Sequence, residues 1–358
     1  MQREETDTMG IFHSLVKKEA LQIVRDRRTM VITIIMPVVL LLLFGFAIST
    51  EVSNVRLTAV VERHDDKTRE IIERFSVNEY FTFQGLTAAD EAENLLRKGE
   101  TDAVLFLKTD EGKVNAQIIV DASNTTNAQA ITGYVQGVLG SGTSAESPVL
   151  TYTLYNPQMK SAYNFVPGIL GMIFILICAI MTSVSIVREK ETGTMNLLLV
   201  SPAKPSVIIL GKLVPYFILS CIILTLMLLI SYTVLGLPVS GSIFNVVLVS
   251  LLYITLSLSI GLLVSTLVSS QLTALIVSAV GFMIPVIMLS GMIFPIENMP
   301  WPLQWLSCLI PARWYVDAMR KLMIQQLDFG LILTNVSVLL SMTVVLLLLS
   351  IKKFKTSK

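Results

Sequence analysis

Charged side chains are scarce in this sequence. Of its 358 residues, 15% are Asp, Glu, Lys or Arg and 53% are hydrophobic, and the mean hydropathy is +0.70. One soluble core cannot bury so much apolar surface, so we expect many side chains to face lipid. The 27 basic and 26 acidic residues leave a net charge of +1. The chain therefore lacks the strongly basic field typical of proteins that bind nucleic acid.

Histidine and cysteine are also rare. With only His13 and His64 in the chain, zinc sites built on several histidines and a Ser/His intramembrane protease are excluded. The cysteines are Cys178, Cys221 and Cys308. Two of them lie within apolar runs, so we expect no disulfide framework. We predict neither a metal site nor a bound cofactor.

A phosphate-binding loop is missing as well. Such a loop needs Gly, four further residues and then Gly-Lys-Ser/Thr. Here Gly211 and Lys212 are followed by Leu213, and Ser206 stands where the first glycine should be. We therefore expect no ATP binding by this device, no catalytic residues and no enzyme activity in this chain.

Long apolar runs, by contrast, are abundant. A bilayer core of roughly 30 Å needs about 20 apolar residues in a helix, and the sequence contains six such runs: 30–50, 165–187, 208–235, 243–268, 272–294 and 330–351. The first is preceded by a long polar segment, unlike the core of a cleaved signal peptide, so we expect it to be retained.

These runs contain no Asp, Glu, Arg or His, and Lys212 lies only near one end. An ion-driven carrier usually needs a buried ionisable relay, so this class is disfavoured. Backbone carbonyls and hydroxyl groups can still bind sodium, so it stays an alternative. An aspartyl intramembrane protease is excluded because no run contains the required Asp.

The basic residues predict the orientation, because short basic loops stay in the cytoplasm. Residues 1–29 contain six Lys or Arg, residues 188–212 contain four, and the tail 352–358 contains four. On the opposite side, 236–242 contains none and 295–329 contains three. Both termini are therefore predicted to be cytoplasmic, in a multi-pass protein of the cell membrane, with residues 51–163 outside.

The outer segment 51–163 is long enough for its own core. Its alternating patterns predict a mixed α/β domain. The expected strands are 57–61, 80–86, 103–107 and 114–120, and the expected helices are 67–75, 88–98 and 125–139. A surface loop is expected at 140–148. The predicted fold class is thus a mainly α membrane protein with six transmembrane helices and an inserted extracytoplasmic α/β domain between the first and second.

Two amphipathic segments lie beside the spans. In 10–28, apolar Phe12, Leu15, Val16, Ile23 and Val24 oppose basic side chains. We expect an interfacial helix that either anchors the first span or contacts a partner. In 312–327, Tyr315, Ala318, Met319 and Leu322 share one side, opposite Arg313, Asp317 and Lys321. This helix is expected along the outer surface.

The polar stretch 188–202 follows the second apolar run and ends in Ser201-Pro202. Taken alone, it could be an ordinary basic loop. Other motifs accompany it. They are Lys17-Lys18-Glu19, Arg25-Asp26-Arg27-Arg28, Pro37, Phe44-Gly45, Asn156-Pro157, Val166-Pro167-Gly168, Gly211-Lys212, Pro215-Tyr216, Pro285, Leu289-Ser290-Gly291, Phe294-Pro295 and Met299-Pro300. In this order they resemble the ABC type 2 exporter permease family over essentially the whole chain.

The resemblance implies a channel of two permeases, identical or paired with a paralogue, and two separate ATP-binding subunits. It implies that 188–206 is the coupling segment and that 1–29 holds the connecting helix. The residues that would meet the ATPase are Arg188, Glu189, Lys190, Glu191, Gly193 and Thr194. One departure is Asn196, where many relatives are expected to have Glu.

By the same resemblance, the dimer seam and transport pathway follow the second and fifth spans. The candidate pathway residues are Phe165, Met172, Phe174, Phe282, Met283, Met288 and Met292. Their soft apolar side chains suit amphipathic substrates, although they could equally face lipid or neighbouring helices. Segment 295–329 is expected to combine an outer re-entrant hairpin with the second amphipathic helix.

The leading hypothesis is an exporter permease that moves hydrophobic or amphipathic compounds, drug-like or lipid-like, with ATP hydrolysed by another subunit. The alternative is a membrane-anchored receptor or assembly factor whose outer domain binds a partner without transport. Neither hypothesis requires nucleic acid.

Overall fold

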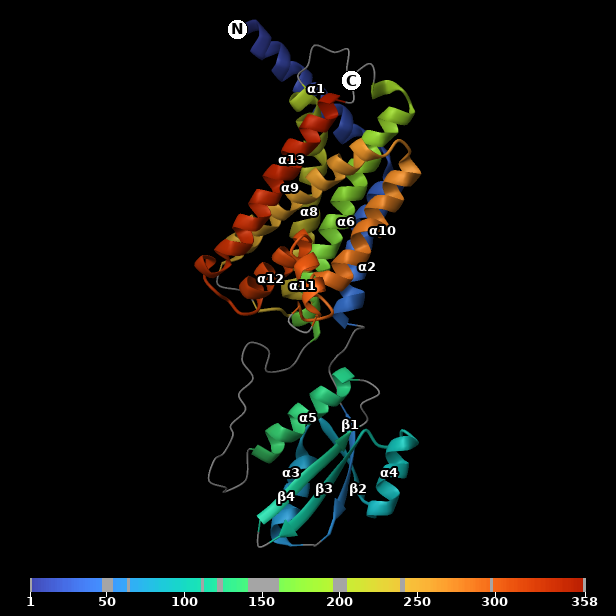
Figure 1. Cartoon of the computed structure of the whole chain (residues 1–358), viewed down its shortest axis with the longest axis vertical. Coiled ribbons are helices and arrows are strands. Elements are labelled where there is room, and N and C mark those ends of the chain that lie inside the picture. Colours follow the sequence, from blue (N-terminus) through green and yellow to red (C-terminus); the bar gives the residue numbers. More distant parts are fainter. Residues whose placement is uncertain are drawn as a thin grey trace. The chain divides into compact units, whose positions relative to one another are not determined.

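The protein is described by a computed structural model covering residues 2–46, 54–62, 65–110, 113–120, 125–140, 161–195, 205–238, 242–296 and 299–356. The chain divides into two compact units (Figure 1). The helical unit comprises Met1–Ile48 and Ala162–Lys358, and the sheet unit comprises Ser49–Ser161. The predicted loop 140–148, apart from its first residue, and Asn196 lie outside the described residues.

Six helices of the helical unit are long and apolar enough to cross a membrane. They are α2 (Arg27–Phe46), α6 (Ser161–Glu191), α8 (Pro205–Thr233), α9 (Ile243–Leu267), α10 (Gln271–Leu289) and α13 (Leu333–Thr356), the last preceded by the short η2 (Phe329–Ile332). The prediction of a mainly helical protein with six apolar spans is thereby confirmed.

Several helix ends differ from the predicted ends by a few residues, and two of them have a clear consequence. Helix α10 stops at Leu289, five residues before the predicted end at Phe294. The chain turns there because Gly291 has φ +81°, a left-handed conformation that ends a helix. Helix α6 continues to Glu191, past the predicted end at Val187. Charged residues beyond the apolar run are therefore still helical.

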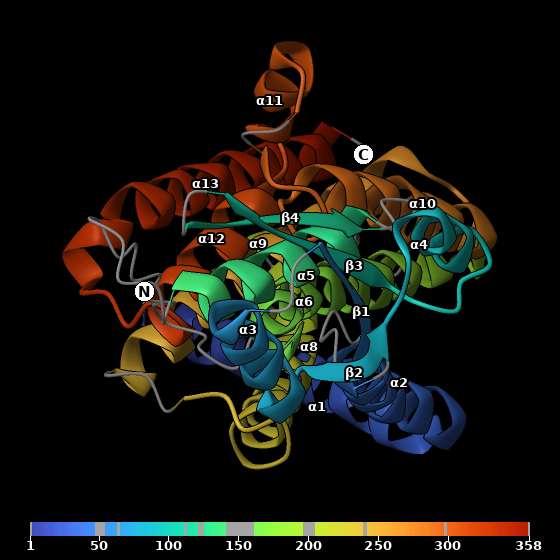
Figure 2. The same ribbon diagram turned by 90° about the horizontal axis from the view of Figure 1, so that it is seen from below.

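Helix α6 occupies the centre of the helical unit, which Figure 2 shows end on. It approaches α9 so closely that a Cβ on Gly261 would lie 2.7 Å from the carbonyl oxygen of Ala179. Hydroxyl groups connect it to two other helices. Ser183 Oγ lies 2.9 Å from Ser278 Oγ of α10, and Cys178 Sγ lies 3.3 Å from Ser220 Oγ of α8.

Beyond α10 the chain forms two shorter helices, α11 (Trp301–Ser307) and α12 (Pro311–Met323). The predicted apolar side of α12 is fully buried and packs on α9 and α13. The helix thus packs into the bundle through this side, and its place along the outer surface stays a prediction. Asp317 and Lys321 form an ion pair of 2.7 Å, whereas Arg313 donates to the Gln304 carbonyl.

The sheet unit holds four strands in the order β2-β1-β3-β4. β1 (Val55–Val61) pairs in parallel with β2 (Phe81–Leu86) and with β3 (Ala103–Asp110), and β3 pairs antiparallel with β4 (Lys113–Val120). The helices are α3 (Asp66–Val77), α4 (Ala89–Arg97) and α5 (Thr125–Gly140). Each predicted strand and helix of this segment is present, within three residues at each end.

One core cluster holds the sheet unit together. It joins Leu57 and Leu105 of the central strands to Phe75 of α3 and Tyr134 of α5. Asp65 starts α3 with a capping box shared with Thr68, and the backbone N–H of Thr68 lowers the pKa of this carboxyl. The central strands β1 and β3 are buried over consecutive residues, including Ala103, Val104 and Leu105.

Candidate functional site

The predicted coupling residues lie at the end of the helical unit that carries both chain termini, here called the terminal end (Figure 1). Arg188, Glu191, Gly193 and Thr194 are exposed there. Lys190 is half-buried, and Glu189 is buried. Four of the six predicted coupling residues are therefore available to a partner at this surface, and Glu189 is turned away from it.

Local contacts explain why α6 ends where it does. Gly193 has φ +72° and its N–H donates to the Lys190 carbonyl, which is the arrangement of a glycine that closes a helix. The hydroxyl of Thr194 donates to the Glu189 carbonyl over 3.3 Å. A Cβ at residue 193 would meet no neighbour within 4 Å, so this position favours glycine through its backbone conformation alone.

Four side chains form an ionic cluster, defined as Lys18, Glu19, Glu189 and Lys212; Lys18 is half exposed and the other three are buried. Lys212 Nζ lies 2.8 Å from Glu19 Oε1 and 2.6 Å from Glu189 Oε2. Lys18 Nζ lies 2.5 Å from Glu189 Oε1. The side chains of Lys212 and Glu19 are only 2% and 1% exposed. The ionic cluster thus ties α1 (Gln2–Arg25) to α6 and α8.

Helix α1 reaches α8 closely because residue 211 is glycine. A Cβ on Gly211 would lie 3.0 Å from Leu15 Cβ, so α1 packs almost directly on the α8 backbone. Glu19 lies one helical turn beyond Leu15, inside the apolar stripe, and reaches Lys212. The sequence motifs included Glu19 but did not predict its burial. The available signal was an acidic residue placed between Leu15 and Ile23 on the predicted apolar side.

Asp26 separates α1 from α2, where a single helix over 10–28 was expected. Its carboxylate accepts hydrogen bonds from the Thr29 backbone N–H at 3.2 Å and from the Thr29 hydroxyl at 2.7 Å. These bonds lower the pKa of Asp26 and cap the first turn of α2. The two helices can therefore take different directions at this residue.

The two neighbouring charges at the end of α6 contact the turn between α9 and α10. Lys190 Nζ donates to the Ser265 carbonyl near the end of α9. Glu191 accepts from the Gln271 backbone N–H at 2.9 Å and from the Gln271 side-chain amide. The last turn of α6 therefore holds the ends of two further helices.

A basic cavity of about 700 Å³ lies between α1 and the end of α6. Its lining includes Lys17, Lys18, Arg25 and Arg188, with Asp26 beside them. Four cations around one concave surface favour an anionic group or an acidic protein surface. The sequence predicted both segments but not that they line one cavity.

The candidate pathway residues fall into two groups. Phe165, Met172, Phe174 and Met292 are buried within the helical unit, and Phe282 is half-buried against the same cluster. Met283 and Met288 are 39% and 47% exposed on α10. The pattern of apolar residues could not separate these groups, because burial depends on neighbouring helices.

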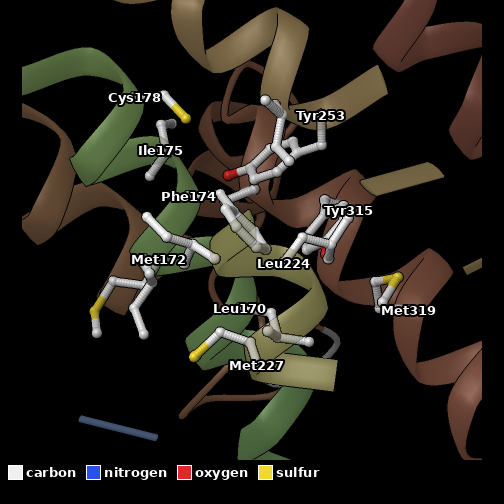
Figure 3. Packing of buried hydrophobic residues seen from close by; sticks show 14 of the residues in the cluster. Leu170, Met172, Phe174, Ile175, Cys178, Leu224, Met227, Tyr253, Tyr315 and Met319 are labelled. Atoms are coloured by element: carbon white, nitrogen blue, oxygen red, sulfur yellow. The ribbon is translucent and has the colours of Figure 1, made fainter. Parts of the chain in front are cut away.

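Met292 illustrates the first group. Its side chain occupies the space in which a Cβ on Gly168 would stand, with its Cγ 2.1 Å from that point. Phe174 packs in the bundle core among Leu224 and Tyr315 (Figure 3). Within this single chain these two side chains act as core residues.

A stacked tyrosine pair in that core was not predicted. The rings of Tyr253 on α9 and Tyr315 on α12 are 4.1 Å apart and nearly parallel (Figure 3). Tyr253 donates to the Gly171 carbonyl of α6 at 2.9 Å, and Tyr315 Oη lies 3.0 Å from Ser250 Oγ. Both polar tips are thus satisfied inside the bundle.

The sheet unit has a pocket of its own, of about 570 Å³. It lies at the carboxyl ends of β1 and β3 beside the start of α4, and its lining includes Val60, Phe106, Lys108 and Gln117. Within the described ranges, no three His, Cys, Asp or Glu side chains stand close enough to hold a metal ion. All three cysteines are free.

Comparison with known families gives one match across nearly the whole chain. Residues 27–352 match the model of the ABC-2 family transporter protein. The matched range includes α2, the sheet unit and all later spanning helices.

Individual relatives agree with this match. The chain is 30% identical over 331 residues to the probable multidrug ABC transporter permease YbhS of Escherichia coli strain K12, covering 86% of this chain and 87% of that protein. It is 29% identical over 353 residues to the probable multidrug ABC transporter permease YbhR of the same strain, covering 93% and 96%. It is 25% identical to ABC transporter G family member 20 of Dictyostelium discoideum, covering 88% of this chain but 46% of that protein.

Proposed function

The chain belongs to the ABC-2 family of transporter proteins, and we propose that it is the permease of an ATP-driven exporter of hydrophobic or amphipathic compounds. The observation that carries the proposal is the family match over residues 27–352 together with two relatives named as multidrug permeases. ATP hydrolysis is assigned to a separate ATP-binding subunit. The permease itself provides the membrane path and the surface that receives this subunit.

We place the ATP-binding subunit at the terminal end. Arg188 lines the basic cavity beside α1, and Gly193 and Thr194 are exposed at the end of the same helix. The cations of the cavity suit an acidic patch on a partner. Glu189, Lys190 and Glu191, expected from sequence to meet the partner, already contact other helices of this chain.

The basic residues at both termini and at the end of α6 support a cytoplasmic terminal end. Helices α2 and α6 precede and follow the sheet unit in sequence. Since each spans the bundle once, the sheet unit is assigned to the opposite, extracytoplasmic side. The same assignment makes residues 295–329 part of the outer mouth.

A second permease is proposed to pack along α10, as a homodimer or with a paralogue. This helix exposes a row of large apolar side chains, including Ile276, Val280, Met283 and Ile284. In such a dimer Met283 and Met288 are the best-placed candidates for the substrate path, since their flexible side chains adapt to varied apolar compounds. Phe174 and Met292 are buried within this chain and are less well placed for contact with a substrate.

The test uses the permease co-expressed with an ATP-binding subunit of an ABC transporter from the same organism. We expect the two to purify together, and inverted vesicles containing them to take up a fluorescent amphipathic dye only with ATP. Charge reversal by R188E with K17E should release the ATP-binding subunit while the permease remains folded. Dye uptake without ATP that collapses with the ion gradient would instead favour an ion-driven carrier.

The second candidate is a receptor or assembly factor that transports nothing. The pocket at the carboxyl ends of β1 and β3 favours it, because open sheets often bind ligands there. This function predicts a stable complex of the permease with an outer partner and without any ATP-binding subunit. Recovery of the ATP-binding subunit with wild-type protein argues against it.

A further inference from the structure

We propose that three consecutive residues, Glu189, Lys190 and Glu191, make the last turn of α6 a junction that positions α8, α9 and α10 together. Glu191 is the positioning residue that couples α10 to α6. This inference rests on the proposed function, since it concerns how a displacement caused by the ATP-binding subunit reaches α10. None of the three residues needs to touch that subunit.

Glu191 accepts a hydrogen bond from a backbone N–H at the start of α10. The first N–H groups of a helix lack partners within the helix. Ser270 Oγ accepts from the Thr273 N–H at 3.1 Å, and Glu191 accepts from the Gln271 N–H at 2.9 Å. A carboxylate at this position also interacts favourably with the positive end of the helix dipole. Glu191 therefore completes the start of α10 from another helix.

Lys190 makes the complementary contact at α9. Its ammonium group donates to the Ser265 carbonyl, within the last turn of a helix that ends at Leu267. The carbonyl end of a helix favours a cation. Adjacent residues of opposite charge thus hold the end of α9 and the start of α10, with only Val268–Ser270 between these helices.

Glu189 extends the junction in a third direction. Because successive helical residues point about 100° apart, its side chain turns toward Lys212 of α8 and Lys18 of α1, at 2.6 and 2.5 Å. One helical turn therefore contacts four other helices. A tilt of α6 must either carry their ends along or break these charged contacts.

The experiment uses the full permease and its ATP-binding subunit in lipid nanodiscs. One spin label is placed at the exposed residue Leu275 of α10 in each of the two permeases of the proposed dimer, after the three native cysteines have been replaced. The distance between labels is measured with and without ATP and vanadate. We expect a shift in the wild type, loss of that shift in E191A, and its recovery in E191Q, whose amide oxygen can still accept from the Gln271 N–H.

The matched control is Q271A, which removes a side-chain contact of Glu191 but keeps the backbone hydrogen bond; it should shift like the wild type. An E191A variant that retains the ATP-binding subunit and the full shift overturns the proposal. So does an E191A variant that loses the subunit, since Glu191 would then be a docking residue.

A second measurement separates this inference from the proposed function. Amide exchange of residues 272–275 is followed in the permease alone, and E191A should accelerate it several-fold while Q271A does not. Unchanged exchange in E191A overturns the junction even if ATP-driven transport is intact. The opposite outcome is also informative. If E191A accelerates amide exchange as expected but the wild-type complex shows no change in label distance, the Glu191 contact is supported. ATP-driven motion, and with it the proposed function, is then contradicted.

Discussion

The two ends of the helical unit are held together by different forces. At the terminal end, charged side chains join α1, α6, α8, α9 and α10 through the ionic cluster and the contacts of Lys190 and Glu191. Toward the end that carries α12, close contacts of glycine, methionine and tyrosine join α6 to α9 and α12. Ion pairs can exchange partners as helices shift, whereas interlocked side chains have essentially one arrangement.

This difference suits a permease that is moved by an ATP-binding subunit at its terminal end, as proposed above. Lys18 already lies within reach of two carboxylates, at 2.5 Å from Glu189 and 3.8 Å from Glu19. A small movement of α1 could therefore transfer it from one to the other. The tyrosine stack and the Gly168–Met292 contact offer no such second partner, and they would move as a rigid body.

The largest effect is expected from K212M, which removes the central cation of the ionic cluster. Two buried carboxylates, Glu19 and Glu189, would then share only the half-exposed Lys18, and breaking a buried pair in this way costs about 3–5 kcal/mol. We expect a sharp fall in the thermal stability of the detergent-solubilised permease, measured by loss of the monodisperse peak after heating.

Its control is the triple variant E19Q/E189Q/K212M, which removes all three buried charges together. Replacing a complete buried ion pair by neutral groups is often nearly neutral for stability, so most of the lost stability should return. If the triple variant is no more stable than K212M, the ionic cluster does not act as an electrostatic unit.

The next effect probes the close packing of α6 on α9, one helical turn from the Lys190 contact with Ser265. In G261A the new methyl group would lie 2.7 Å from the Ala179 carbonyl oxygen, so α6 and α9 must separate, at a cost of about 1–3 kcal/mol. Gly281 on α10 is the matched control, because a Cβ there meets nothing within 4 Å. G281A should leave the melting temperature close to that of the wild type, and equal losses in both variants would contradict tight α6–α9 packing.

A smaller effect is expected at the tyrosine stack. Y253F keeps the ring on Tyr315 but removes the hydrogen bond to the Gly171 carbonyl, which leaves a buried acceptor without that donor and costs about 1 kcal/mol. Y253A should cost several times more, because it also empties the space of the ring. A Y253F variant as unstable as Y253A would mean that the hydrogen bond stabilises the bundle more than the packing of the ring does.

Sequence patterns predicted the six spans and the strands of the sheet unit because these elements follow from local periodicity. Leu57 and Leu105 belong to short apolar runs of the kind that form the central strands of a sheet, and the run 243–268 is simply long and apolar. The stretch 188–202 was singled out through its resemblance to a family, and four of its predicted coupling residues are exposed.

The pairing of side chains could not be predicted in the same way. Glu19 and Lys212 are 193 positions apart, and nothing local to either indicates the other. The contact depends on Gly211, which lets α1 approach α8. Phe174 is buried and Met283 is exposed because different helices surround α6 and α10. Such information resides in tertiary packing, which a single sequence does not display.

The smallest effect is expected from a half-exposed ion pair in the sheet unit, in contrast to the buried pair of Lys212 and Glu19. Arg56 and Asp102 join β1 to the start of β3 at 2.7 Å, with side chains 42% and 36% exposed. Burial raises the pKa of Asp102, but hydrogen bonds from Arg56 outweigh it, and the pKa is lowered overall. The charged form is therefore favoured in the folded state.

A lowered pKa fixes the sign of the pH dependence. The pair stabilises the sheet unit above the ordinary carboxyl pKa of 3.8, and this contribution disappears as the pH falls through the lower pKa of the folded state. Because the pair is accessible to solvent, it is worth at most about 1 kcal/mol. Amide protection of β1 and β3 should thus fall with acidification more steeply in the wild type than in D102N. If amide protection falls with pH in parallel in the wild type and D102N, the ion pair with Arg56 contributes nothing to stability. High salt should reduce the difference between the two pH profiles, because salt screens the accessible Arg56–Asp102 pair but not the buried Lys212.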